Sequence, residues 1–139
     1  MTTWSCIVPG RPKTKGNSKR IVRMGARLRV IGSTSALKAE SDARSVIAAH
    51  APPAPLQGAL RCTVVFVFAI PQGKRKGKHK IEPGAPCLLK VDRGNLLKLI
   101  EDAMNGLVYD DDSQIVSGDV SKVWGDVDET QIHVETFYL

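Results

Sequence analysis

The alternation of hydrophobic and polar positions predicts mostly short strands, separated by turns rich in glycine and proline. The strongest strand signal covers residues 62–70, a nearly continuous run of β-branched and aromatic side chains. A run of this kind is typical of a strand that is covered on both faces. Weaker strand signals cover residues 4–8, 20–24, 27–31, 113–124 and 129–138, and the second and third of these predict a hairpin.

Two further stretches have helical spacing. Hydroxyl side chains at 33–35 predict the start of a helix that runs to about residue 50, where two prolines follow. A second helix is predicted over 95–105, with Gly106 at its C-terminal end. The order of elements predicts an α+β fold in a single domain over residues 1–139, with two main helices packed on one mixed sheet.

Charge divides the chain into two parts. Residues 1–90 carry 17 Lys and Arg against 3 Asp and Glu, whereas residues 91–139 carry 3 against 11. A hydrophobic content of 42% excludes a disordered basic tail, and the net charge of +6 suits a polyanionic partner. No stretch is long and apolar enough to span a membrane, so we expect a cytoplasmic protein.

The three cysteines argue against a disulfide framework and against a structural zinc site. Their number is odd and their spacings are wide, with no C-x-x-C pair. Cys6 and Cys62 lie in strand-like runs, which predicts buried, reduced thiols.

The acidic part contains three adjacent aspartates, Asp110 to Asp112. Like charges at this spacing repel one another. One interpretation is an acidic turn that is exposed to solvent, and the other is a site in which these carboxylates bind a divalent cation. Mg²⁺ prefers oxygen ligands and often needs only two carboxylates in addition to the substrate phosphate, which suggests one or two of these aspartates together with Asp92. Lys98 would then stabilise charge on the phosphate, although Lys98 and Asp102 on a lone helix also read as a solvated i,i+4 pair.

Residues 91–115 resemble the core signature of the RusA-type Holliday junction resolvases. The signature combines one aspartate, an Asn-x-x-Lys step, Asp-Ala-x-Asn-Gly and then Asp-Asp-x-Gln, and Lys122 also fits. The resemblance implies a homodimeric, Mg²⁺-dependent endonuclease that nicks four-way DNA junctions symmetrically, with Mn²⁺ not distinguished from Mg²⁺. It assigns the metal to Asp92 and Asp112, an accessory role to Asp111 and the essential lysine to Lys98. It implies no small-molecule cofactor.

One position departs from this signature. The family pattern commonly has a second aspartate where this chain has Gly94, and glycine offers no side-chain ligand. Three interpretations follow. Asp102, Asp110 or Asp111 replaces the missing ligand; the site works with more water; or the protein has lost catalysis and kept DNA binding.

Two basic segments are candidates for contact with the DNA backbone. The segment 11–29 has eight Lys and Arg and no acid, and the segment 74–80 has five Lys and Arg in seven residues. Few aromatic side chains accompany them, which favours recognition of DNA shape over stacking on single strands. The predicted DNA contacts are Lys13, Lys15, Lys19, Arg20, Lys74, Arg75, Lys76, Lys78, Lys80 and Asn95. A basic adaptor that binds an acidic protein is a further, weaker interpretation of the same charges.

Overall fold

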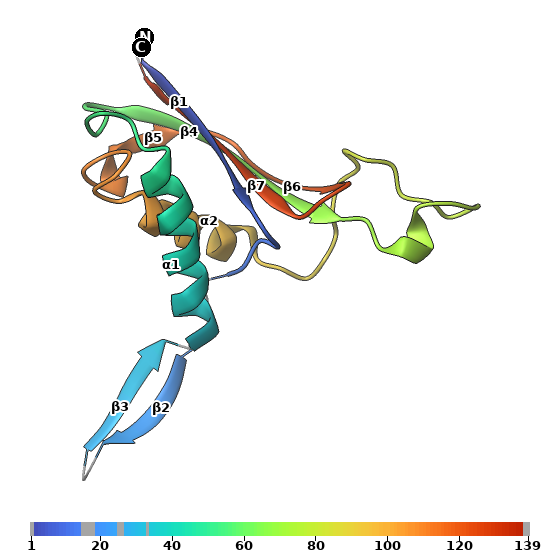
Figure 1. Cartoon of the computed structure of the whole chain (residues 1–139), viewed down its shortest axis with the longest axis horizontal. Coiled ribbons are helices and arrows are strands. Elements are labelled where there is room, and N and C mark those ends of the chain that lie inside the picture. Colours follow the sequence, from blue (N-terminus) through green and yellow to red (C-terminus); the bar gives the residue numbers. More distant parts are fainter. Residues whose placement is uncertain (1, 15–18, 25–26, 33, 138–139) are drawn as a thin grey trace.

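The computed structural model describes residues 2–14, 19–24, 27–32 and 34–137. Its body is a five-stranded mixed sheet with two helices on one face (Figure 1). The strands are β1 (Thr3–Pro9), β4 (Leu60–Ala69), β5 (Ile115–Ser117), β6 (Val120–Gly125) and β7 (Glu129–Thr136), and the helices are α1 (Thr34–Ala49) and α2 (Arg93–Met104). This architecture confirms the predicted α+β fold.

The sheet is arranged around β4 and β7. β7 pairs antiparallel with β1 on one side and with β4 on the other. The other edge of β4 pairs in parallel with β5 near its start and with β6 farther along. The strand with the strongest sequence signal is therefore an interior strand of the sheet, as its β-branched composition suggests.

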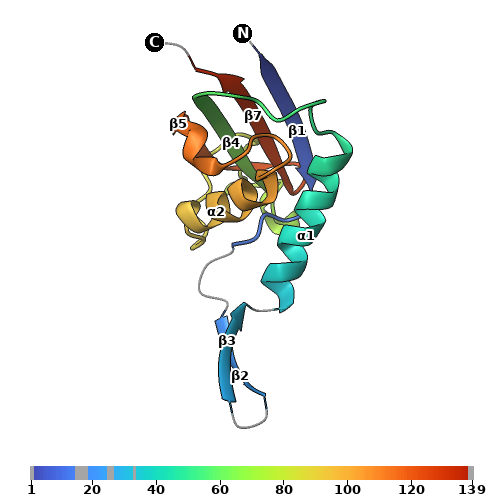
Figure 2. The same cartoon turned by 90° about the vertical axis from the view of Figure 1, so that its left-hand side faces the viewer.

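The prediction that β4 is covered on both faces is wrong. Both helices pack on the same side of the sheet (Figure 2), so alternate residues of β4 remain partly exposed on the other side. These include Arg61, Thr63 and Val65, whereas Val64 and Phe66 face the helices and are buried. The reason is that β4 pairs antiparallel with β7 as well as in parallel with β5 and β6, and a sheet with antiparallel pairing can leave one face to solvent.

The single closing strand predicted over 113–124 is also wrong, since the structure divides it into three parts. A short 3-10 helix, η2 (Asp112–Gln114), precedes β5, and Gly118 separates β5 from β6. Gly118 has φ +142°, and a Cβ there would lie 1.7 Å from the backbone oxygen of Cys62. Only glycine permits this close approach of two strands.

The hydrophobic core lies between the sheet and the helices. The helix predicted over 95–105 is present as α2, and its buried residues are Leu96, Leu99, Ile100, Ala103 and Met104. All three cysteines are free and buried, as predicted for Cys6 and Cys62. Within the described ranges, no helix combines the length and apolar character needed to cross a bilayer.

Two segments extend from this body. The predicted hairpin is present as β2 (Lys19–Met24) and β3 (Arg27–Gly32), which pair antiparallel and project beyond the N-terminal end of α1 (Figures 1 and 2). The long loop after β4 includes the 3-10 helix η1 (Gln72–Lys74) and projects from a different end of the sheet (Figure 1). The hairpin strands and the loop after β4 thus stand away from the core.

Candidate active site

Asp92 forms the N-terminal cap of α2. Its Oδ1 accepts a hydrogen bond from the backbone N–H of Asn95 at 3.0 Å, and its own backbone is extended. This bond satisfies a backbone donor that the first turn of a helix leaves open. The helix therefore begins at Arg93, two residues before the predicted start, and Asp92 has a structural role besides the predicted metal ligation.

Lys122 fixes the segment that leads into this cap. Its Nζ donates to the backbone carbonyls of Leu89 at 2.8 Å and Val91 at 2.9 Å. Because Lys122 belongs to β6, these bonds tie the residue before Asp92 to the sheet. The family resemblance includes Lys122, but no pattern in the sequence indicates this positioning role.

A buried tyrosine connects the end of α2 to the aspartate triplet. The hydroxyl of Tyr109 donates to the backbone carbonyl of Glu101 at 2.7 Å, and the ring is fully buried. Burial raises the pKa of Tyr109 far above its ordinary value, so the phenol stays protonated as the donor. The carbonyl of the preceding residue, Val108, accepts from the backbone N–H of Leu56 at 2.7 Å. The chain just before the triplet is therefore held against α2.

Gln114 orders the triplet itself. Its Oε1 accepts from the backbone N–H groups of Asp110 at 2.9 Å and Asp111 at 3.1 Å. Its Nε2 donates to the carbonyls of Leu56 and Gly58, both at 3.0 Å. This bonding explains physically why the signature places a glutamine after the aspartates.

Asp111 serves the same turn as an N-cap. Its Oδ2 accepts from the backbone N–H of Ser113 at 3.0 Å, in a capping box with Gln114. Hydrogen bonds from the Ser113 side chain and backbone lower the pKa of Asp111 below its ordinary value. Two of the acids in the predicted site, Asp92 and Asp111, are thus helix caps.

The third aspartate of the triplet, Asp112, meets the predicted lysine. Lys98 Nζ lies 3.5 Å from Asp112 Oδ2 and 3.3 Å from Asp102 Oδ1, so the ammonium bridges two carboxylates. The Asp102 carboxylate is the main reason that the pKa of Lys98 is raised, and Lys98 therefore remains charged at neutral pH. The sequence predicted the pair of Lys98 with Asp102, but it gave no contact between Lys98 and Asp112.

The pKa of Glu101 reflects the crowding of negative charge around Lys98. Its pKa is raised first by burial and then by repulsion from Asp112 and Asp102, while Lys98 acts in the opposite direction. Sequence reasoning did not single out Glu101. We call Lys98, Glu101, Asp102 and Asp112 the Lys98 cluster.

The chemistry of these side chains fits Mg²⁺, but the predicted ligands are not gathered at one point. In the described part of the chain, no three His, Cys, Asp or Glu side chains lie close enough together to hold a metal ion. Mg²⁺ is commonly held by one or two carboxylates with several waters and a substrate phosphate, which Asp112 and a neighbouring carboxylate would satisfy. The metal stays a prediction.

Gly94 lies in the first turn of α2, on the side of the helix that carries Lys98. It lines an open pocket of about 370 Å³ together with Arg93, Leu97, Gly118, Asp119 and Val120. Its backbone does not require glycine, and a Cβ at this position would meet only Asp92 Oδ1, at 3.1 Å. An aspartate would therefore fit at position 94 with a small shift of the Asp92 side chain.

The predicted DNA contacts of the loop after β4 are mostly exposed. Lys74, Lys76, Lys78 and Lys80 face solvent, and Lys80 Nζ lies 3.0 Å from Glu82 Oε1. Arg75 is different, because it is half-buried and its Nη2 donates to the backbone carbonyl of Asp126 at 3.0 Å. Arg75 thus anchors the loop to the turn between β6 and β7.

The remaining predicted contacts lie elsewhere. Asn95 is half-buried in the first turn of α2. Lys15 lies outside the described residues; Lys19 and Arg20 lie in β2, and their side chains are also outside the described part.

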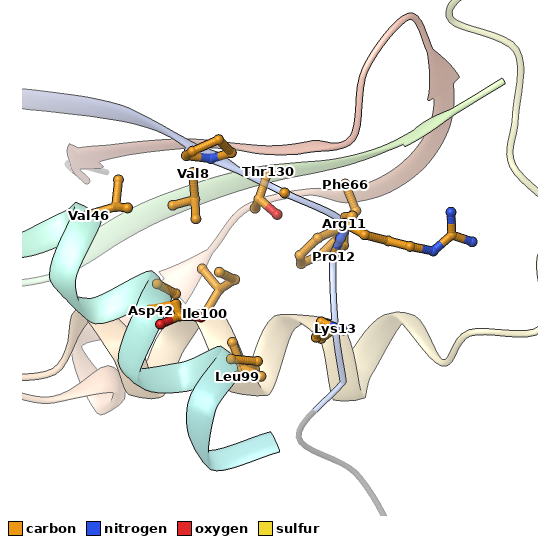
Figure 3. A pocket seen from close by; sticks show the side chains of 14 residues that line it. Val8, Arg11, Pro12, Lys13, Asp42, Val46, Phe66, Leu99, Ile100 and Thr130 are labelled. Atoms are coloured by element: carbon orange, nitrogen blue, oxygen red, sulfur yellow. The ribbon is translucent and has the colours of Figure 1, made fainter. Parts of the chain in front are cut away.

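Lys13 borders a pocket of about 330 Å³ between the end of β1, α1 and α2 (Figure 3). The pocket is mainly apolar, and the Arg11 side chain points away from it toward the ring of Phe68, 5.3 Å from the ring centroid. Leu99 and Ile100 line it from another face of α2 than the one that carries Lys98. The pocket is therefore separate from the Lys98 cluster.

The residues of the candidate active site lie within a part of the chain that matches one known family. Residues 9–135 match the family described as "Endodeoxyribonuclease RusA". The chain belongs to the RusA endodeoxyribonuclease family. A relative in Bacillus subtilis (strain 168), "Uncharacterized protein YqaN", is 26% identical over 131 residues, which are 91% of this chain and 92% of that protein. Membership of the RusA family indicates endodeoxyribonuclease activity on branched DNA.

Proposed function

We propose that this protein is a Mg²⁺-dependent, structure-selective endodeoxyribonuclease that resolves four-way DNA junctions. It acts as a homodimer in recombination and repair, and it makes paired symmetric nicks. The observation that carries the proposal is the Lys98 cluster, in which one ammonium meets Asp102 and Asp112 within the span matched by the RusA family.

Asp112 and Asp92 are the proposed metal ligands, and Asp111 is an accessory. A bound Mg²⁺ supplies Lewis-acid polarisation of the scissile phosphate and stabilisation of the leaving oxygen, and Mn²⁺ has similar ligand preferences. Asp102 is a further candidate ligand, since it shares Lys98 with Asp112. It cannot occupy the place of a side chain at Gly94, because the two positions are eight steps apart on the helix, which is about 12 Å along the axis.

Lys98 is the proposed electrophilic residue. Its charge is secured by its carboxylate neighbours, and more than half of its side chain is exposed to solvent. A fixed ammonium beside the scissile phosphate stabilises the negative charge that develops on the phosphate and on the 3′ oxygen.

The proposed DNA surface consists of the two projecting basic segments. The exposed lysines of the loop after β4 offer phosphate contacts, as do Lys13 and the basic residues of the hairpin strands in the sequence. Binding through such contacts falls steeply with salt and depends little on base sequence.

The test is cleavage of an end-labelled synthetic four-way junction, compared with a linear duplex of the same sequence, in Mg²⁺ and in EDTA. The proposal expects nicks at symmetric positions in opposite strands, only with the metal and only on the branched substrate. Equal cleavage of the linear duplex would contradict structure selectivity, and cleavage in EDTA would contradict the metal requirement.

A second candidate is a junction-binding protein that has lost catalysis, and Gly94 is the observation that favours it. It predicts salt-sensitive junction binding without product in either Mg²⁺ or Mn²⁺. Because position 94 has room for a side chain, Gly94→Asp distinguishes the candidates. A lapsed enzyme should gain metal-dependent nicking from this change, whereas Gly94→Asn, which adds a side chain of similar size without charge, should not.

A further inference from the structure

One apolar side chain in the segment before α2 projects into solvent. Leu88 is 87% exposed, whereas the other exposed large hydrophobic side chains that the structure describes are 56–59% exposed. Its two neighbours in the chain are not exposed, since Cys87 is buried and Leu89 is half-buried. A single exposed leucine is common on protein surfaces, so its meaning depends on how its backbone is held and on what lies beside it.

The backbone on both sides of Leu88 is bonded in place. The backbone N–H of Cys87 donates to the carbonyl of Lys122 in β6 at 3.0 Å. On the other side, the carbonyl of Leu89 accepts from Lys122 Nζ at 2.8 Å and from the backbone N–H of Val91 at 2.7 Å. Leu88 is thus displayed between two anchored residues rather than on a free loop.

The same segment leads directly to a proposed metal ligand. Exposure alternates along residues 87–92, and the exposed positions are Leu88, Lys90 and Asp92. Alternate residues of an extended segment lie on the same side of the chain, so Leu88 lies on the side that carries Asp92. The four residue steps between them span at most about 14 Å. This length corresponds to about four base steps along one DNA strand.

We propose that Leu88 is a wedge that enters the stack of bases at the branch point of a DNA junction, beside the phosphate that is cut. Leucine is one of the apolar side chains that unstack a base step and kink the DNA when they enter it. Such a wedge needs only one side chain, whereas the apolar patches that mark protein–protein interfaces are much larger. The exposed Lys90 suits a phosphate next to the opened step.

A wedge at this position contributes to the choice of substrate. Bases are stacked at every step of a linear duplex, but stacking is interrupted at the branch point of a junction, so insertion costs least there. Leu88 therefore favours branched over linear DNA. The inference rests on the proposed function in that it takes a DNA junction as the substrate, but it does not require cleavage.

The first test is the fluorescence of 2-aminopurine placed beside the branch point of a synthetic four-way junction, measured in EDTA with saturating protein. This base analogue fluoresces more strongly when it is unstacked. We expect a rise with wild type and the same rise with Leu88→Met, which keeps an apolar side chain of similar size. Leu88→Ala should lose most of the rise, whereas Leu37→Ala, at a leucine that is 59% exposed on α1, should keep it.

Two results would overturn the inference: a wild type that shows no rise, or an equal rise for Leu88→Ala at saturation. Because Leu88 faces solvent, Leu88→Ala should keep the Tm of wild type, so loss of the rise does not reflect unfolding. A protein that unstacks the branch point but cuts no DNA would leave this inference intact and contradict the proposed function. A protein that cuts the junction without unstacking it would do the reverse.

A second test measures affinity instead of fluorescence. In EDTA, wild type should bind a junction with a mismatched pair at the branch point more tightly than a fully paired junction, because an unpaired base costs less to unstack. Leu88→Ala should bind the two junctions about equally. The same preference in both proteins would overturn the inference, since the preference would then not come from Leu88.

Discussion

The N-terminal cap of α2 and the Lys98 cluster both use acidic side chains, but they use them differently. At the start of α2, and likewise at the start of η2, Asp92 and Asp111 accept backbone hydrogen bonds as helix caps. In the Lys98 cluster, Asp112 and Asp102 instead share a lysine side chain. A cap explains why a carboxylate is present without any chemistry, and the i,i+4 pair with Lys98 explains Asp102 in the same way. The contact of Asp112 with Lys98 is different, because it joins η2 to α2 and belongs to neither element's own turn. The difference separates the acids that shape the backbone at a helix start from those that meet the lysine side chain.

The largest effect should come from removing the ammonium that joins the cluster. Lys98→Met is expected to lower the rate of single-turnover junction cleavage by about 100-fold or more, because it removes a fixed charge beside the reacting phosphate. Junction binding should change little, since Lys98 is one of 20 positive residues.

The control is Lys38→Met, which breaks an i,i+4 Lys–Asp pair away from the cluster, formed by Lys38 and Asp42 at 2.9 Å on α1. Its cleavage rate should stay near wild type. If both variants lose activity equally, the loss does not come from the cluster.

An intermediate effect should separate the two roles of Asp92. Asparagine caps a helix about as well as aspartate, whereas alanine in place of such a cap costs about 1 kcal/mol of stability. Urea unfolding in EDTA should therefore show Asp92→Ala destabilised by about this amount and Asp92→Asn close to wild type. Both variants should lose Mg²⁺-dependent cleavage if Asp92 also holds the metal. If Asp92→Asn cuts as fast as wild type, Asp92 acts only as a helix cap and does not hold the metal.

The smallest effect concerns Glu101 and pH. Burial and the neighbouring aspartates raise the pKa of Glu101 in the folded protein above its ordinary value of 4.5. The contribution of Glu101 to stability is therefore fully present below this value and is lost as pH rises through the raised one. Glu101→Gln should raise Tm slightly at pH 7 and leave it unchanged near pH 4, measured by calorimetry in EDTA. Glu82→Gln, at an exposed pair with Lys80, should show no such gain at pH 7.

Much of the fold was predictable because local patterns agree with the final packing. The β-branched run of β4 and the apolar stripe of α2 were both recognised, since each is dictated by the period of its own element. The break at Gly118 was not recognised, because it depends on how closely β4 approaches in space. The prediction that both faces of β4 are covered failed for a similar reason, because the sequence of a strand does not determine which other elements pack on its faces.

The candidate site was predictable in its residues but not in its contacts. The resemblance identified Asp92, Lys98 and Asp112, whereas the structure shows that Asp112 and Asp102 meet at Lys98. The capping roles of Asp92 and Asp111, and the part that Tyr109 plays in placing the triplet, follow from hydrogen bonds to backbone groups. A sequence motif lists residue types at a spacing, and it does not say which of them the backbone already uses.

The most direct test of the central claim compares two neighbouring aspartates with the same substitution. Asp112→Asn and Asp111→Asn each remove one charge, and asparagine at position 111 can still cap η2. Single-turnover cleavage of a labelled four-way junction in Mg²⁺ should fall by about 100-fold or more for Asp112→Asn and only by a small factor for Asp111→Asn. Full activity of Asp112→Asn, or an equal loss in both variants, would contradict the assignment of catalysis to the Lys98 cluster.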